Sequence, residues 1–190
     1  MTRMRPGPQL KPGGLSRPAT GNWQVDPARS RASFTAQIVG RAVRGCVPLT
    51  GHVLIAKPIE HSTALLAASA SEVSTGSLAL DRLLAGTGFL DAAAFPEITF
   101  RSELLVWVPA GWRAVGHLQV KGIQHELACQ LGLHHEGALL EGLPRFWITG
   151  SWVIDSRWIT PQWIPGLSRR IAMTCSFLLE PRDAGRLAAL

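Results

Sequence analysis

The chain has 190 residues, of which 46% are hydrophobic and 17% are charged. This length suits one domain, and this composition can bury a core, which excludes a wholly disordered chain. No stretch reaches the roughly 18 uninterrupted apolar residues that a transmembrane helix needs. Glycine (19) and proline (13) together exceed one residue in six, which favours a turn-rich all-β chain over a helical bundle.

The formal net charge is +6, and most of it belongs to the N-terminal segment. Residues 1–20 hold no acid and four basic residues, Arg3, Arg5, Lys11 and Arg17. We interpret them as a disordered basic Pro/Gly-rich tail, followed by one domain at residues 21–181 and a frayed tail at residues 182–190. A solubilising role is the favoured interpretation of the basic tail, and contact with a membrane surface is the alternative.

The cysteines and histidines form no pattern typical of a disulfide framework or a metal site. Cys46, Cys129 and Cys175 are odd in number, widely spaced and set in apolar stretches, so we expect buried free thiols. Neighbours on a strand point to opposite faces, so His134 and His135 are poorly placed to share one ion. With no signal segment at the start, the predicted location is cytoplasmic, with peripheral membrane attachment left open.

The dominant hydrophobic period is two, as expected for strands with one apolar face. In chain order, this alternation predicts strands at residues 32–38, about 43–56, about 63–74, 98–106, 117–121, 127–133, 146–154 and 171–179. Residues 77–91 break the alternation and predict a short helix with a loop, inserted between two strands. Eight antiparallel strands of this kind form a sandwich or a closed barrel, and such a barrel is either filled or holds one small ligand.

Three blocks of motif residues follow one another along the chain. The first block is Trp23-x-x-Asp26-x-x-x-Ser30-x-x-x-Phe34. The second block contains Thr75-Gly76, Asp81, Leu84, Phe89-Leu90-Asp91, Phe95-Pro96 and Ile98-Thr99-Phe100-x-Ser102. The third block is Gly116-x-Leu118-x-Val120-Lys121-Gly122-Ile123.

In order and spacing, these blocks resemble the YceI-like family, a lipocalin-like group of polyisoprenoid-binding proteins. The resemblance covers residues 23 to about 180. It implies an all-β fold, an eight-stranded antiparallel lipocalin-like barrel with a short helix inserted between two central strands. The family usually has polar residues beside the central acid, where this chain has Leu80 and Leu83. Because these two residues are apolar, whether this segment contacts a polar headgroup is left open.

The resemblance also implies a hollow barrel whose apolar pocket holds a long isoprenoid tail. Taken with the apolar stripes, it predicts as ligand-binding residues Phe34, Ile38, Leu84, Phe89, Phe95, Ile98, Phe100, Leu104, Trp152, Met173 and Phe177. Asp81, Asp91 and Arg101 are candidates for contact with a headgroup. For the two acids, acceptance of backbone N–H groups around the inserted helix is the preferred alternative.

The predicted function is a non-enzymatic binding and carrier protein for a long lipophilic isoprenoid, such as a quinone tail or a polyprenyl phosphate. No catalytic residue, metal or cofactor is predicted beyond the bound isoprenoid lipid, because the sequence lacks the usual catalytic and nucleotide-binding motifs. Two alternatives stay open: an enzyme acting on a hydrophobic substrate inside such a barrel, and a filled barrel that serves as an interaction or stress-associated module.

The seven tryptophans raise the question of partners other than the lipid. They are not interleaved with a Lys/Arg cluster, so no nucleic-acid partner is predicted. A homodimer is a further alternative, because Trp-rich edges need cover. Residues 158–165 are apolar and loop-like, and they are a candidate lip that touches a membrane or a second copy of the chain.

Overall fold

The computed structural model describes residues 18–108, 111–135, 145–160 and 164–182. The predicted tails at residues 1–20 and 182–190 therefore lie largely outside the described residues. The strands are β1 (Gly21–Val25), β2 (Arg31–Ile38), β3 (Arg41–Pro48), β4 (Thr50–Ile55), β5 (Thr63–Ser69), β6 (Glu97–Val108), β7 (Gly111–Val120), β8 (Ile123–His135), β9 (Phe146–Asp155) and β10 (Arg170–Pro181). The helical elements are α1 (Leu78–Ala85) and the short 3-10 helices η1 (Ile59–His61), η2 (Ala70–Glu72) and η3 (Ser156–Trp158).

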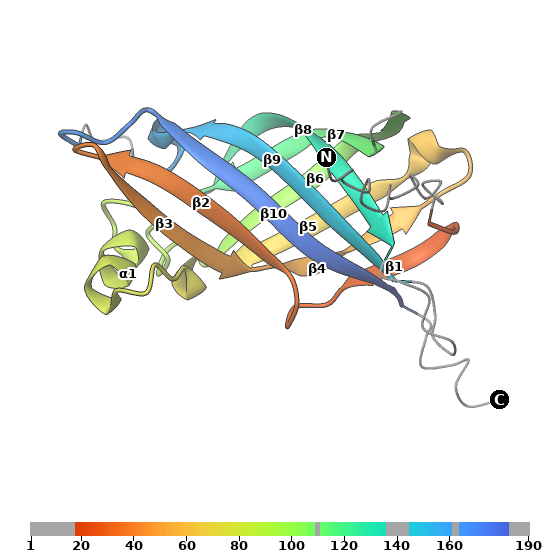
Figure 1. Cartoon of the computed structure of the whole chain (residues 1–190), viewed down its shortest axis with the longest axis horizontal. Coiled ribbons are helices and arrows are strands. Elements are labelled where there is room, and N and C mark those ends of the chain that lie inside the picture. Colours follow the sequence, from red (N-terminus) through yellow and green to blue (C-terminus); the bar gives the residue numbers. More distant parts are fainter. Residues whose placement is uncertain (1–17, 109–110, 136–144, 161–163, 183–190) are drawn as a thin grey trace, which may run out of the picture.

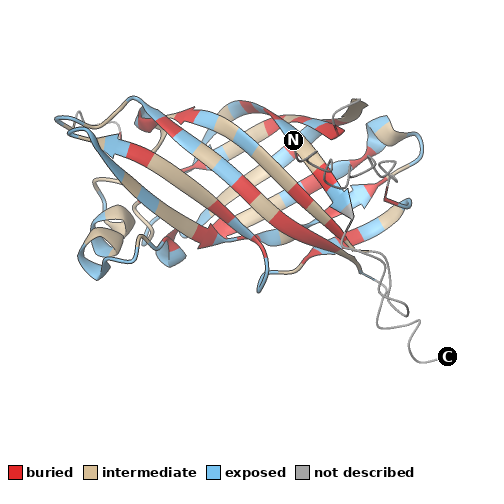
Figure 2. Cartoon of the chain, in the orientation of Figure 1, coloured by how far each residue is buried: buried red, intermediate tan, exposed pale blue. Residues whose placement is uncertain are grey.

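The sheet closes on itself because β10 pairs antiparallel with three strands, β9, β2 and β1. β1 and β2 therefore share one position around the barrel, with a break between them, and β3 and β4 share the next position. The ten segments thus fill eight positions, which confirms the predicted eight-stranded antiparallel barrel (Figure 1). Buried and more exposed residues alternate along the visible strands, as one-faced strands require (Figure 2).

Ser30 bridges the break between β1 and β2. Its buried hydroxyl accepts a hydrogen bond from the amide of Leu178 at 2.9 Å, and its carbonyl accepts one from the amide of Leu49 at 3.0 Å. The amide of Asp26 in turn donates to the Leu178 carbonyl at 3.0 Å. Buried backbone groups at a strand break need partners, so two residues of the first motif block keep the barrel closed here.

Several element boundaries differ from those predicted. The strand expected at residues 43–56 is divided at Leu49, after Pro48, which has no N–H to continue the ladder. β1 was not predicted as a strand, and β7 begins at Gly111 rather than near residue 117. The helical part of residues 77–91 is limited to α1, which ends before Gly86.

A β-bulge between Ser102 and Leu104 reverses the expected orientation of the second half of β6. An extra residue in one strand turns the following side chains to the other face. As a result Leu105 is 3% exposed and belongs to the core, whereas Leu104 is 39% exposed. The prediction that Leu104 lines the pocket is therefore wrong, because a uniform period of two does not continue past Ser102.

The two ends of the barrel are built differently. At one end, aromatic rings fill the interior: Trp23 packs edge-on against Phe146 with centroids 5.2 Å apart, and Trp107 packs edge-on against Trp112 at 5.7 Å. The other end carries the β2–β3 turn and α1 (Figure 1). Large rings therefore stabilise one end of the core, and the end beside α1 is left for a cavity.

The bulge predicts a clear contrast between two adjacent leucines. We expect Leu105→Ala to lower the free energy of unfolding by about 2–5 kcal/mol, because it leaves a void in a packed core. Leu104→Ala should change it by less than about 1 kcal/mol, because that side chain already meets solvent. Urea denaturation of both variants measures the difference, and similar losses at the two positions would contradict the bulge.

Candidate functional site

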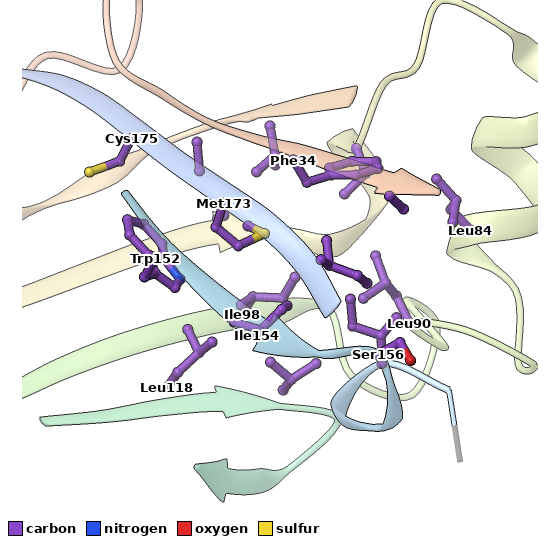
Figure 3. A pocket seen from close by; sticks show the side chains of 18 of the residues that line it. Phe34, Leu84, Leu90, Ile98, Leu118, Trp152, Ile154, Ser156, Met173 and Cys175 are labelled. Carbon is purple, nitrogen blue, oxygen red and sulfur yellow. The ribbon is translucent and has the colours of Figure 1, made fainter. Parts of the chain in front are cut away.

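An apolar cavity occupies the half of the barrel beside α1. Its volume is about 210 Å³, counted as the space open to the centres of water molecules. One water needs only roughly 10–15 Å³ on that measure, so the barrel is hollow here rather than filled. The surrounding side chains come from the strands, α1 and the β9–β10 connection. Figure 3 shows Phe34, Ile98, Trp152 and Met173 reaching into this common space.

Nine of the eleven residues predicted to line a pocket lie together in the cavity wall. They are Phe34, Ile38, Leu84, Phe89, Ile98, Phe100, Trp152, Met173 and Phe177. Leu104 is on the outer face of the barrel, for the reason given above. Phe95 is not in the wall; it lies against the β7–β8 turn, where a β-carbon at Gly122 would be 3.1 Å from its ring.

The space itself depends on small residues that the sequence analysis did not select. Ala32 and Ala36 of β2 and Ala67 and Ala68 of β5 line the cavity, where larger side chains would fill it. Ala32 and Ala36 stand in the apolar stripe of residues 32–38, and their small size is the feature of the sequence that indicates space inside the barrel. Leu80 and Leu83, which replace the family's polar residues, also face the cavity.

The cavity opens at the end beside α1, because Leu83 belongs to its wall and is 54% exposed, and on this side β3 separates from β5. Among the described residues, β3 is joined along this edge by an isolated bridge, in which Cys46 and Ser74 exchange two backbone hydrogen bonds of 2.8 Å. The chain then runs through Thr75 into α1, which lies next to β3 at one end of the barrel (Figure 1). The inserted helix thus occupies the place of a missing strand pairing and supplies apolar side chains to the mouth.

Asp81 fixes α1 in this position. Its Oδ1 accepts hydrogen bonds from the backbone N–H and the side-chain hydroxyl of Thr75, both at 2.6 Å, and the Ser74 hydroxyl donates to Oδ2 at 3.4 Å. The Thr75 hydroxyl and then its amide hold the pKa of the Asp81 carboxyl below its usual range. Asp81 was a candidate either for contact with a headgroup or for local hydrogen bonds around the inserted helix. The structure shows the local hydrogen bonds.

The other two candidates for headgroup contact lie away from the cavity wall. Asp91 has a left-handed backbone (φ 50°), and its carbonyl accepts hydrogen bonds from the amides of Ala94 and Phe95. Arg101 is exposed on β6, opposite His117 of β7. Neither side chain is among those that line the cavity.

The polar side chains of the described cavity wall come from the β9–β10 connection instead. Ser156 and Thr160 are buried, and both contribute to the cavity wall. Next to them, the Asp155 carboxylate accepts hydrogen bonds from Arg157 at 2.8 and 3.0 Å and from Arg169 at 3.0 Å. These bonds, led by that from the Arg157 side chain, hold the pKa of Asp155 far below its usual range.

Three buried nitrogen atoms have no hydrogen-bond partner within the part of the chain that the structure describes: Trp112 Nε1, Trp152 Nε1 and His125 Nε2. Only Trp152 of these residues lines the cavity. His125 stacks on Trp158 with ring centroids 4.3 Å apart and an interplanar angle of 10°. The sequence analysis missed this stack, which packs η3 against the start of β8.

Two cysteines also stand in the cavity wall. Burial raises the pKa of the Cys129 thiol to about 11 and that of the Cys175 thiol to about 12. Both are free and buried, as predicted, whereas Cys46 is only partly buried, because it lies beside Ser33 on the outer face of the barrel. Within the described residues no group of three His, Cys, Asp or Glu side chains could hold a metal ion. His134 is exposed, and the side chain of His135 lies outside the described residues.

The helices of the described residues are all too short or too polar to cross a membrane. The fold and the cavity together define a lipocalin-like β-barrel with a hollow interior. The model of the YceI-like domain matches residues 23–157, more than half of the chain, and the chain therefore belongs to the YceI-like family. β10, which closes the barrel, follows the matched region.

Solved structures with the same fold have diverged far in sequence. The chain is similar to BcnA of Burkholderia cenocepacia, with a TM-score of 0.70 and 16% identity over 81% of this chain and 98% of that one. A polyisoprenoid binding domain from Saccharophagus degradans, implicated in plant cell wall breakdown, has a TM-score of 0.62 and 12% identity over 84% of this chain and 98% of that one. The YceI protein of Campylobacter jejuni has a TM-score of 0.63 and 15% identity over 74% of this chain and 86% of that one. No curated protein matches the chain.

The His125–Trp158 stack predicts a pH dependence of stability. Burial lowers the pKa of the His125 imidazole below its ordinary value of 6.5, so the folded protein favours the neutral ring. As the pH falls through 6.5, the unfolded chain binds a proton that the folded protein resists, and stability decreases until the lowered pKa is passed.

We expect His125→Phe to keep the stack and to remove this part of the pH dependence. Melting temperatures measured from about pH 7.5 to about pH 5 should fall less for this variant than for the parent protein. His52→Phe, at an exposed position on β4, is the control. An unchanged slope in the His125 variant would contradict the prediction.

Proposed function

We propose that the protein is a non-enzymatic binding and carrier protein for a long lipophilic isoprenoid, held by its tail in the barrel. The carbon-lined cavity carries this proposal. Each CH₂ group removed from water contributes about 0.8 kcal/mol, so a long hydrocarbon tail binds such a wall without polar recognition. Membership of the YceI-like family and the likeness to a polyisoprenoid binding domain support this class of ligand.

The difference between the two ends supports a defined orientation of the ligand. The Trp23–Phe146 and Trp107–Trp112 pairs fill the far end, so the tail enters first and stops against apolar rings. The hydroxyls of Ser156 and Thr160 in the β9–β10 connection are the polar side chains of the described cavity wall, and a polar head near them would meet hydrogen-bonding groups. A quinone ring or a polyprenyl phosphate fits this arrangement.

The remaining parts of the proposal are binding rather than catalysis, the location of the protein, and its partners. Among the described residues that line the cavity, the titratable groups are the thiols of Cys129 and Cys175. Both are protonated at neutral pH, which favours binding over catalysis. Three free cysteines favour a reducing, cytoplasmic location. Attraction of the basic N-terminal tail to anionic lipid, and a homodimer, stay predictions.

Native mass spectrometry of the purified protein, followed by organic extraction, tests the proposal. We expect a bound mass that matches an isoprenoid quinone or a polyprenyl species, or uptake of such a lipid when it is added. An unliganded protein that takes up neither quinones nor polyprenyl phosphates would overturn the carrier function.

A matched pair of substitutions tests whether the ligand occupies the cavity. Ala36→Phe places a ring in the cavity, and Ala172→Phe places the same ring on the outer face of the neighbouring strand β10. We expect the first variant to bind an isoprenoid quinone at least about tenfold more weakly, because it removes space that the tail would fill. Binding by the second variant should stay within about twofold of the parent value. Equal affinities in a titration followed by tryptophan fluorescence would contradict binding inside the barrel.

A further inference from the structure

The most exposed large hydrophobic side chains gather around the mouth of the cavity. Among the described residues, Val39, Leu78, Leu83 and Ile123 are 54–77% exposed. The other exposed members of this class, Leu54, Leu65, Leu104 and Val153, are only 37–44% exposed and are spread over the barrel wall. Apolar groups gathered at one end mark a surface that meets another apolar phase.

The four residues belong to three segments at the end of the barrel beside α1. Val39 lies in the β2–β3 turn, and its amide donates to the Gly166 carbonyl of the β9–β10 connection at 2.8 Å. Leu78 and Leu83 belong to α1. Ile123 follows the β7–β8 turn, where Lys121 Nζ lies 3.5 Å from the Thr87 carbonyl, just after α1. We call residues 38–41, 78–85 and 120–123 the rim.

Val39 shows that this exposure is built into the fold. Its backbone has φ 50°, a left-handed conformation that is unfavourable for a β-branched residue. A glycine or an asparagine would fit this turn with less strain, and a polar residue would suit its exposure. The chain instead holds a valine there, with most of its surface in water.

Each segment of the rim also carries one basic residue, Arg41, Arg82 or Lys121. The acid of the rim is Asp81, whose carboxylate is occupied by Thr75. Apolar tips flanked by cations match the chemistry of an anionic bilayer, in which the tips enter the acyl boundary and the cations meet phosphates. A two-fold dimer through the same surface would instead bring the three basic residues of each rim together at one interface.

We propose that the rim docks the barrel, mouth first, on an anionic phospholipid bilayer. This docking surface is distinct from the basic N-terminal tail and extends the proposed carrier function by giving a water-insoluble ligand a route between membrane and cavity. It rests on the rim residues themselves, so it can be tested without any isoprenoid.

The test is cosedimentation of the full chain with vesicles that contain no isoprenoid, made of phosphatidylcholine with or without phosphatidylglycerol. The rim variant carries Val39→Ser, Leu78→Ser and Ile123→Ser, and it leaves Leu83 unchanged because that residue lines the cavity. The wall variant carries Leu54→Ser, Leu65→Ser and Val153→Ser as a matched control. Two further variants neutralise either the rim cations (Arg41→Gln, Arg82→Gln and Lys121→Gln) or the four basic residues of the tail.

We expect the parent protein to bind vesicles with phosphatidylglycerol more tightly than vesicles without it. The rim variant and the rim-cation variant should each bind at least about tenfold more weakly, and the wall variant should stay within about twofold of the parent. The rim-cation variant keeps all apolar contacts, so its result stands even if the rim variant fails to fold.

Three results would overturn the proposal: no vesicle binding by the parent protein, equal binding by rim and wall variants, or loss of binding with the tail variant alone. Light scattering gives the oligomeric state of each protein. If the parent protein is a dimer that does not bind vesicles, and the rim variant is a monomer, the rim serves self-association instead. Lipid uptake is read separately by native mass spectrometry. A parent protein that takes up lipid but does not bind vesicles contradicts the docking surface, whereas a parent protein that binds vesicles but takes up no lipid contradicts the carrier function.

Discussion

The structure depends on the closure of the barrel by β10, because eight one-faced strands have nowhere else to bury their apolar sides. β10 pairs with β9 along most of its length and divides its other edge between β2 and β1. Ser30 makes this division possible by pairing the backbone groups that the break exposes. A closed ring has no free edges along the closed part, and it forces every inward side chain to share one interior.

That shared interior is used in two ways, and the difference comes from side-chain size. Aromatic rings fill the end near β1, whereas alanines of β2 and β5 leave room beside α1. On the side of the cavity β3 separates from β5, and α1 lies beside this separation, held by the bonds between Asp81 and Thr75. The inserted helix therefore forms part of the wall and part of the entrance, and its place is fixed by one carboxylate.

The sequence predicted the barrel and most of its cavity, because period-two stripes and motif order are local signals. It failed where the cause was not local. The bulge after Ser102 depends on pairing with β7, where a β-carbon at Gly116 would lie 2.1 Å from the Arg101 carbonyl oxygen. Phe95 was assigned from its motif, but its partner is a turn distant in sequence. The stack of His125 on Trp158 likewise joins segments more than 30 residues apart, and no pattern in either segment indicates it.

The two thiols in the cavity wall have a chemical consequence for whatever the cavity holds. Burial raises the pKa of the Cys129 thiol to about 11 and that of the Cys175 thiol to about 12, so both are protonated at neutral pH. Nucleophilic attack by cysteine requires the thiolate, so an electrophile stored there meets only a soft, polarisable wall. The depth that makes the cavity apolar therefore also makes its two thiols poor nucleophiles.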